Sequence, residues 1–280
     1  GCVMTLDAEQ PRSGGNTRGT GDPTATGPAT CEMVENLPFA TDGGIAERAA
    51  IGLIVLATDN TIEYEFRRVF DLAGVGLYAA RIRNSAQITP QTLAALAPSI
   101  TATTDLILPG MPMDVVGFGC TSASMVLGEE RVFELISAAR PKAKPTTPIT
   151  AAFAAFDACG AKRIAVLTPY RKDVNDIVRN YIEKRGYEVP VFGSFNEEDD
   201  NRVSRISPDS LLRGIDRITS RHLVDMVFVS CTSLRLVDAA AAVEAKLGLP
   251  VTSSNHALAW HSLRLAGIAD RLPRFGRLFT

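Results

Sequence analysis

Two stretches of the 280-residue chain share one pattern, Val115-Val-Gly-Phe-Gly-Cys-Thr-Ser-Ala-Ser124 and Met226-Val-Phe-Val-Ser-Cys-Thr-Ser-Leu-Arg235. In each, an apolar run typical of a buried strand leads directly into Cys-Thr-Ser, and a helical pattern follows. The two cysteines are 111 positions apart. A weaker similarity is seen between Ala50-Ile-Gly-Leu-Ile-Val-Leu-Ala and Ala161-Lys-Arg-Ile-Ala-Val-Leu-Thr. The repeats predict two similar halves.

Around these stretches, short apolar runs alternate with longer amphipathic segments, which is typical of an α/β fold with parallel sheets. The strands are continuous apolar runs, as expected when helices cover both faces of a sheet. We predict strands at 51–57, 76–82, 115–119, 163–168, 188–192, 226–230 and 250–252. Helices are predicted at 62–72, 92–108, 123–139, 150–159, 174–185, 208–221, 234–247 and 256–266.

We interpret the halves as two α/β lobes that offer the carboxyl ends of their strands to a shared cleft, where ligands of such sheets bind. The first lobe comprises residues 45–147 plus 253–280, and the second comprises 148–252. Residues 1–44 are rich in Gly, Thr, Pro and Asp and contain few apolar residues. Such a segment buries too little surface to offset its ordering entropy, so we expect a disordered tail.

Composition excludes several classes of function. The formal net charge of −2 gives no basic surface for nucleic acid, and no apolar run is long enough to cross a bilayer. Five cysteines without zinc-site spacing indicate reduced thiols and a cytoplasmic protein. His256 and His261 lie five positions apart, which does not suit a helical metal pair, so we expect no metal.

The Cys-Thr-Ser triplets are candidates for chemistry because a strand-to-helix turn exposes backbone N–H groups that bind anions. Cys120 and Cys231 are the predicted nucleophiles or proton carriers, with pKa values lowered by the helix start. The hydroxyls of Thr121, Ser122, Thr232 and Ser233 are predicted to hold a small carboxylate. The plainer alternative is that each cysteine is a small buried side chain and each hydroxyl a helix cap.

Three further polar residues follow predicted strands and are candidate carboxylate ligands. Asn60 follows the strand at 51–57, Tyr170 the strand at 163–168, and Asn196 the strand at 188–192. Two of them have an alternative role, Asn60 as a helix cap and Tyr170 as a packing residue. The acidic run after Asn196 is interpreted as a solvated loop.

Taken in order, these segments resemble the aspartate/glutamate racemase superfamily, and within it the maleate cis-trans isomerase and arylmalonate decarboxylase branch. The resemblance covers about 51–268 and includes Asp59-Asn-Thr-Ile-Glu, Leu167-Thr-Pro-Tyr and Pro250-Val-Thr-Ser-Ser-Asn-His-Ala. Stretches at 146–156 and 193–200 look especially like the racemase-like protein encoded with bacterial ectoine-utilisation genes.

The resemblance implies a two-lobed, pseudo-twofold fold that needs no cofactor. It implies that Cys120 and Cys231 isomerise a small carboxylate or amino-acid derivative, by racemisation, epimerisation or cis-trans isomerisation. Asn60, Tyr170 and, less directly, Asn196 would hold the carboxylates. Decarboxylation ranks lower because single-cysteine decarboxylases lack the first cysteine. A carboxylate-binding protein without turnover, a redox-sensing disulfide and a homo-oligomer remain open alternatives.

Overall fold

The computed structural model describes residues 30–280. Residues 30–41 contain no helix or strand and are exposed, while Asp42–Thr280 forms a separate compact unit. The predicted tail therefore lies largely outside the described residues, at 1–29. Everything below concerns Asp42–Thr280.

The first sheet has four parallel strands in the order β2-β1-β3-β4. Every residue of β1 is buried, as its unbroken apolar sequence predicts for a central strand. The sheet comprises β1 (Ala49–Leu56), β2 (Val75–Ile82), β3 (Val115–Gly119) and β4 (Lys144–Thr146).

The second sheet repeats this arrangement with four parallel strands in the order β6-β5-β7-β8. It comprises β5 (Arg163–Thr168), β6 (Glu188–Ser194), β7 (Met226–Val229) and β8 (Val251–Ser253). Each strand has a number four higher than the strand at the same place in the first sheet, so β3 and β7 occupy equivalent positions. The predicted α/β fold with two similar parallel sheets is confirmed. The exact lobe boundaries stay a prediction.

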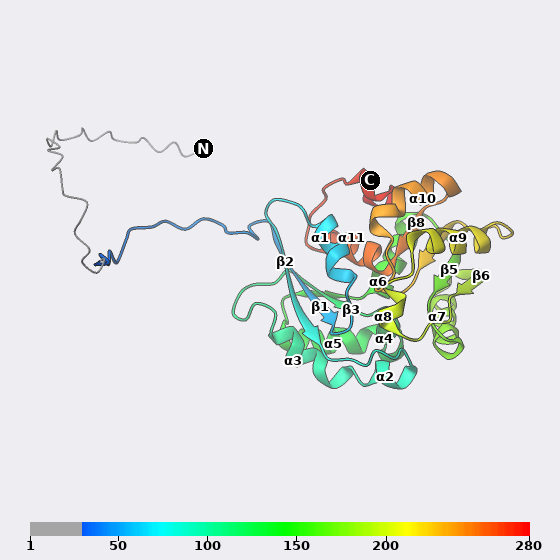
Figure 1. Cartoon of the computed structure of the whole chain (residues 1–280), viewed down its shortest axis with the longest axis horizontal. Coiled ribbons are helices and arrows are strands. Elements are labelled where there is room, and N and C mark those ends of the chain that lie inside the picture. The colour runs from blue at the N-terminus through cyan, green and yellow to red at the C-terminus, as the bar shows by residue number, and fades with distance from the viewer. Residues whose placement is uncertain (1–29) are drawn as a thin grey trace, which may run out of the picture. The chain divides into compact units, whose positions relative to one another are not determined.

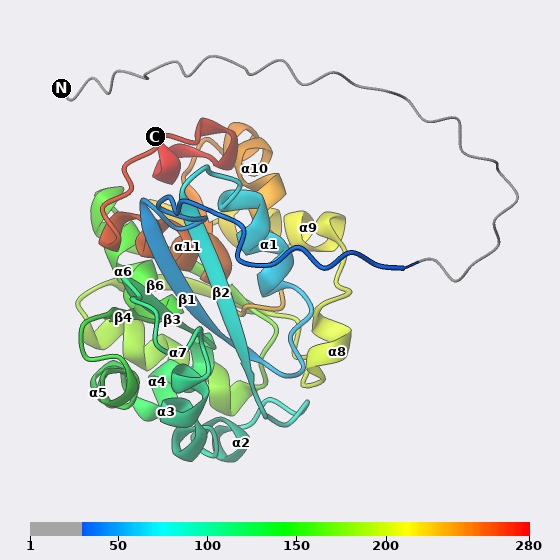
Figure 2. The ribbon, with the colours of Figure 1, turned by 90° about the vertical axis from the view of Figure 1, so that its left-hand side faces the viewer.

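Helices cover both sheets (Figures 1 and 2). In the first half, α3 packs on β1 and β2, α5 on β4, and α11 on β3 and β4. These surroundings comprise α1 (Ile62–Val69), α2 (Pro90–Ala94), α3 (Ala97–Asp105), α4 (Thr121–Leu127), α5 (Glu129–Ala139) and α11 (Ser254–Leu265). Although α11 follows β8 of the second sheet, its packing on β3 and β4 ties the chain end to the first.

In the second half, α7 packs on β6, α9 on β5 and β6, and α10 on β8, while α6 contacts β3 and β8 and joins the halves. The helices are α6 (Pro148–Ala158), α7 (Lys172–Lys184), α8 (Asp200–Val203), α9 (Pro208–Thr219) and α10 (Ala240–Leu247). In α9 the apolar residues Leu211, Ile215 and Ile218 recur at helical spacing and are buried. No helix among residues 30–280 has the length and hydropathy to cross a membrane.

Several predicted elements differ from the observed ones. The short strand β4 was not predicted, because Lys144-Pro-Thr has no apolar run. The predicted helix at 123–139 is split at Gly128, whose φ of 88° ends α4 and precedes α5. The predicted helix at 92–108 is likewise two helices. The helix predicted at 234–247 is wrong in its first half: a 3₁₀ turn at Val237–Ala239 precedes α10.

Candidate active site

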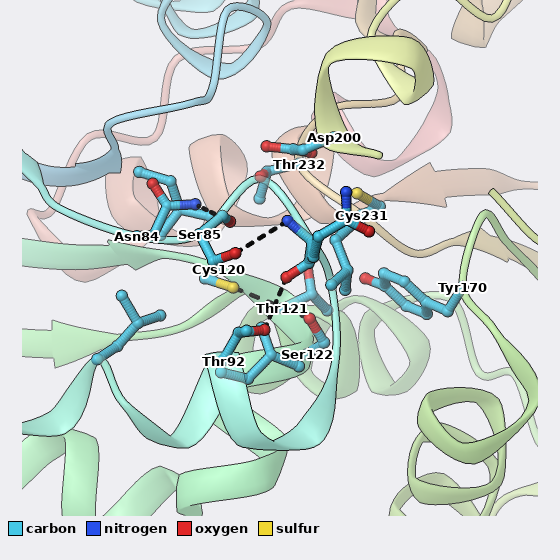
Figure 3. A pocket seen from close by; sticks show the side chains of 15 residues that line it. Asn84, Ser85, Thr92, Cys120, Thr121, Ser122, Tyr170, Asp200, Cys231 and Thr232 are labelled. Atoms are coloured by element: carbon cyan, nitrogen blue, oxygen red, sulfur yellow. Dashed lines mark hydrogen bonds between the residues drawn. The ribbon is translucent and has the colours of Figure 1, made fainter. Parts of the chain in front are cut away.

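Cys120 and Cys231 line one pocket at the carboxyl ends of β3 and β7 (Figure 3). The pocket contains about 420 Å³ of empty space, its opening to solvent included. Its wall also contains Thr121, Ser122, Tyr170 and Thr232, so six of the nine predicted site residues lie together. The remaining lining residues are Leu56, Asn84, Ser85, Gln87, Ile88, Thr92, Leu93, Leu96 and Asp200.

Cys120 is the residue before α4 and is buried. Its thiol lies within hydrogen-bond reach of the Ala123 backbone N–H and 3.9 Å from Ser122 Oγ. Burial nevertheless raises the pKa of the Cys120 thiol to about 12. The predicted lowering of the Cys120 pKa is wrong, because loss of hydration outweighs the backbone hydrogen bond.

Cys231 is buried and has a backbone φ of 123°, a conformation that side chains other than glycine rarely adopt. Burial, and to a smaller extent the charge of Asp200, raises the pKa of the Cys231 thiol well above its ordinary value. A hydrogen bond from the backbone N–H of Ser233 lowers this pKa but does not offset the rise. Thr232 and Ser233 form a turn rather than a helix start. Strained backbone of this kind is a feature of functional sites, where the surrounding fold maintains it.

Ser254 joins the two triplets. Its hydroxyl accepts a hydrogen bond from Thr121 Oγ1 at 2.5 Å and one from the backbone N–H of Cys231 at 2.9 Å. The backbone N–H of the strained Cys231 thus has a hydrogen-bond acceptor in the first residue of α11. The N-cap of that helix is the preceding residue, Ser253. The position of Ser254 directly after β8 makes it a candidate, from the sequence, for capping the last helix or lining the cleft. The cap is Ser253, and Ser254 instead connects the two triplets.

Tyr170 follows β5 and is buried, with its hydroxyl 3.2 Å from Ser230 Oγ. Burial raises the pKa of Tyr170 well above its ordinary value, and negative charge on Cys231 or Cys120 raises it further. The phenol is therefore neutral at neutral pH and can donate a hydrogen bond beside both thiols. The hydroxyl of Ser122 is a second neighbour of this phenol.

Three predicted ligands do not line the pocket. Asn60 is exposed and lines a different hollow, while the neighbouring Asp59 carboxylate is buried and accepts the N–H groups of Thr61 and Ile62. Asn196 is exposed, and its amide donates to the Tyr170 carbonyl at 3.2 Å. Ser233 is buried but does not line the pocket.

Two carboxylates missed by sequence analysis surround the second triplet. Thr232 Oγ1 donates to Asp59 at 2.7 Å, and Ser233 Oγ donates to Asp200 at 2.5 Å. Asp200 lies at the end of the acidic run, and the interpretation of that run as a solvated loop is wrong for this residue, which is 4% exposed. Its burial depends on contacts with residues more than 100 positions away, which no local pattern reveals.

The pocket is covered by two loops, one after β2 and one after β6. The Ile88 N–H donates to the Glu198 carbonyl at 3.1 Å, and the Asp200 N–H donates to the Ala86 carbonyl at 3.0 Å. These bonds connect a loop of the first sheet to a loop of the second. They also fix the backbone of Asp200 at the edge of the pocket.

The family model described as arylmalonate decarboxylase matches residues 52–279. The chain belongs to the arylmalonate decarboxylase family. One curated relative is the maleate isomerase of Pseudomonas putida, which is 29% identical over 82% of this chain and 96% of the relative. Another is the arylmalonate decarboxylase of Bordetella bronchiseptica, which is 32% identical over 48% of this chain and 57% of the relative. The crystal structure of the maleate isomerase from Pseudomonas putida S16 superposes with a TM-score of 0.74, at 25% identity, over 82% of this chain and 98% of that one.

Membership in the arylmalonate decarboxylase family confirms the resemblance to the branch that contains maleate isomerases and decarboxylases. It also confirms the expectation of an enzyme of the maleate isomerase-like kind. The relation to ectoine-utilisation genes stays a prediction.

Proposed function

We propose that this member of the arylmalonate decarboxylase family isomerises a small carboxylate without a cofactor, using Cys120 and Cys231 as a pair. The observation that carries the proposal is the placement of both thiols in one pocket, at the ends of the equivalent strands β3 and β7. Thiols that approach a bound carbon from two lobes can act on it from opposite sides.

We propose that Thr121, Ser122, Tyr170 and Thr232 hold the substrate. Each lines the pocket with a hydroxyl, and the neutral Tyr170 phenol suits donation to a carboxylate. The hydroxyls of Thr121 and Thr232 already donate to Ser254 and Asp59, so these two can only accept a hydrogen bond from the substrate. Ser233 contributes through its bond to Asp200. Asn60 and Asn196 are left out of the proposed set because both are exposed outside the pocket.

Two chemical routes fit a thiol pair. In proton exchange, one thiolate removes a proton from the carbon beside the carboxylate, and the second thiol returns a proton to the opposite face. The two sulfurs then have exchanged protonation states, and no electron is gained or lost. In the adduct route, one thiolate adds to an alkene carbon, the carbon–carbon bond rotates, and the thiolate leaves.

The test is turnover by Cys120→Ser and Cys231→Ser on compounds that the unmodified enzyme converts, with Cys159→Ser as the matched control. Cys159 is half-buried and outside the pocket. We expect either site substitution to lower kcat at least about a thousandfold, and the control to keep it within about twofold. Full turnover by both site variants would contradict the proposal.

Deuterated water separates the routes. Incorporation of deuterium at the carbon beside the carboxylate supports proton exchange, and isomerisation without incorporation supports the adduct route. Decarboxylation is the second candidate, because the family model and the Bordetella bronchiseptica relative carry that name. Stoichiometric release of CO₂ would establish it in place of isomerisation.

We further propose that the substrate is an intermediate of ectoine breakdown, such as a derivative of diaminobutyrate, in a cytoplasmic enzyme. This rests on the resemblance of residues 146–156 and 193–200 to the ectoine-associated proteins. Conversion of such a derivative with a kcat/KM well above that for maleate would support it, and conversion of maleate alone would contradict it.

A further inference from the structure

The only formal charge in the pocket wall is negative. Among its lining residues Asp200 is the only one that carries a formal charge, and no Lys, Arg or His belongs to the wall. A carboxylate substrate is ordinarily matched by cationic side chains or by many N–H donors. Here a buried anionic side chain faces the same space as the two thiols.

Burial raises the pKa of Asp200, and hydrogen bonds from two neighbouring hydroxyls act against that rise. Ser233 Oγ donates to its Oδ1 at 2.5 Å and Thr58 Oγ1 donates to its Oδ2 at 2.7 Å. Both partners are neutral, so they stabilise the ionised form without cancelling its charge. An ionised carboxylate has about four acceptor positions, which leaves capacity on each oxygen for a further donor.

A second carboxylate deepens the negative potential. Asp59 lies behind Thr232, is 2% exposed, and accepts only from the hydroxyl of Thr232 and two backbone N–H groups. Arg81 contacts the Asp59 backbone carbonyl, but its guanidinium forms an ion pair with Glu63 at 2.7 Å and is partly exposed. Among residues 30–280, neither Asp59 nor Asp200 forms an ion pair, and no cationic side chain lines the pocket.

We propose that the substrate carries an ammonium group in addition to its carboxylate, and that Asp200 binds this ammonium and so selects amino-acid-like compounds over plain dicarboxylates. The inference rests on the proposed function for the location of the substrate and deepens it by naming the substrate class. A plain dicarboxylate would add two negative charges next to two buried ones. An ammonium supplies the missing donor and the missing charge together.

The same contact would assist the thiols. Negative charge on Asp200 and Asp59 raises the pKa of both cysteines. A bound ammonium neutralises part of this field, so the pKa of each thiol falls when the substrate enters. One thiol then releases its proton to solvent and becomes the thiolate that the reaction requires.

The test compares binding of compounds with and without ammonium groups. We would measure Kd by calorimetry at pH 7 for aspartate against succinate and for 2,4-diaminobutanoate against butanoate, with Asp200→Asn and the matched control Asp199→Asn. Asp199 caps α8 through the Asn201 N–H and does not line the pocket. We expect at least about tenfold tighter binding of one ammonium-bearing compound, a loss of most of that preference in Asp200→Asn, and no loss in Asp199→Asn.

The inference is overturned if succinate and butanoate both bind as tightly as their ammonium-bearing partners, or if none of the four compounds binds at about 10 mM, a concentration typical of weak binding. It is also overturned if Asp200→Asn keeps the preference. A protonated Asp200 that donates to a substrate carboxylate would give that last result. The unmodified enzyme decides the first two outcomes even if Asp200→Asn fails to fold. Failure of the proposed function is separate, since cysteine-dependent turnover of maleate with no ammonium preference would retain the thiol pair and reject this role of Asp200.

Discussion

Thr121 and Ser254 are joined by a hydrogen bond of 2.5 Å between their hydroxyls, and the same Ser254 oxygen accepts the backbone N–H of Cys231. One serine thus links the first Cys-Thr-Ser triplet to the second. Because the Cys231 backbone has an unfavourable φ, its N–H partner helps to maintain the position of the second thiol.

Replacement of Ser254 by Ala should therefore lower kcat as well as the free energy of unfolding. The buried Cys231 N–H loses its acceptor, at a cost of about 1–3 kcal/mol in the free energy of unfolding, and kcat should fall at least about tenfold. Ser253→Ala is the control, since Ser253 caps α11 by accepting the His256 N–H. It should lose about 1 kcal/mol with kcat nearly unchanged. Equal kcat in both variants, measured beside urea unfolding, would refute the link.

Gly119 should not tolerate a side chain, because a Cβ there would lie 2.5 Å from the Ile54 carbonyl oxygen of the neighbouring strand. We expect Gly119→Ala to destabilise the protein by about 1–3 kcal/mol and to displace Cys120, with a loss of turnover. Gly117→Ala on the same strand is the control, because its Cβ would meet only side-chain atoms at 3.5 Å or more. Denaturant midpoints and kcat measure both effects, and a fully active, stable Gly119→Ala would show that the close approach is absent.

Burial raises the pKa of Asp59 from 3.8 to about 6, and this has a consequence for stability against pH. Between about pH 4 and pH 6 the folded chain holds a proton on Asp59 that the unfolded chain has lost. Stability from this group therefore falls as pH rises through that window, and at pH 7 Asp59 disfavours folding by up to about 3 kcal/mol.

Asp59→Asn should remove that slope and raise the free energy of unfolding at pH 7 by about 1–3 kcal/mol. Its side-chain oxygen can still accept the Thr61 and Ile62 N–H groups. Thermal or urea unfolding across pH 4–8 measures the difference. An unchanged slope, or a variant less stable at pH 7 than the unmodified enzyme, would contradict the assignment.

Alkylation kinetics report the buried thiols. Because the thiolate is the reactive form and the pKa of Cys120 is raised to about 12, its reaction with iodoacetamide should be slow at pH 7. Its rate should rise about tenfold per pH unit up to pH 10. Cys31 is exposed and provides the reference rate in the same mass-spectrometric digest. Alkylation of Cys120 at pH 7 as fast as that of Cys31 would show that the thiol is ionised without a ligand.

The sequence predicted seven of the eight strands in residues 30–280, and the equivalence of the two triplets, because both depend on local apolar runs. The predicted bounds of β3 and β5 agree with the structure. The prediction failed where contacts between residues distant in sequence determine the structure. Asp200 looks solvated in Glu197-Glu-Asp-Asp, yet it is buried by a backbone bond to Ala86 and by hydroxyls from Thr58 and Ser233.

The helix expected directly after Cys231 shows the same limit. Thr232 and Ser233 have the composition of a helix cap, but their hydroxyls donate to Asp59 and Asp200 instead of capping backbone N–H groups. The chain consequently forms a turn there, and α10 begins only at Ala240. The asymmetry between the triplets, a helix start at one and a strained turn at the other, follows from these two carboxylates.

The most direct measurement of the paired-thiol claim is a crystal structure of the Cys120→Ser variant with the compound that the unmodified enzyme converts best. We predict ligand density in the pocket between residues 120 and 231, with one carbon within about 4 Å of both the introduced serine oxygen and the Cys231 sulfur. Density that contacts only one of these atoms, or that lies outside the pocket, would contradict the claim that the two thiols act on one carbon.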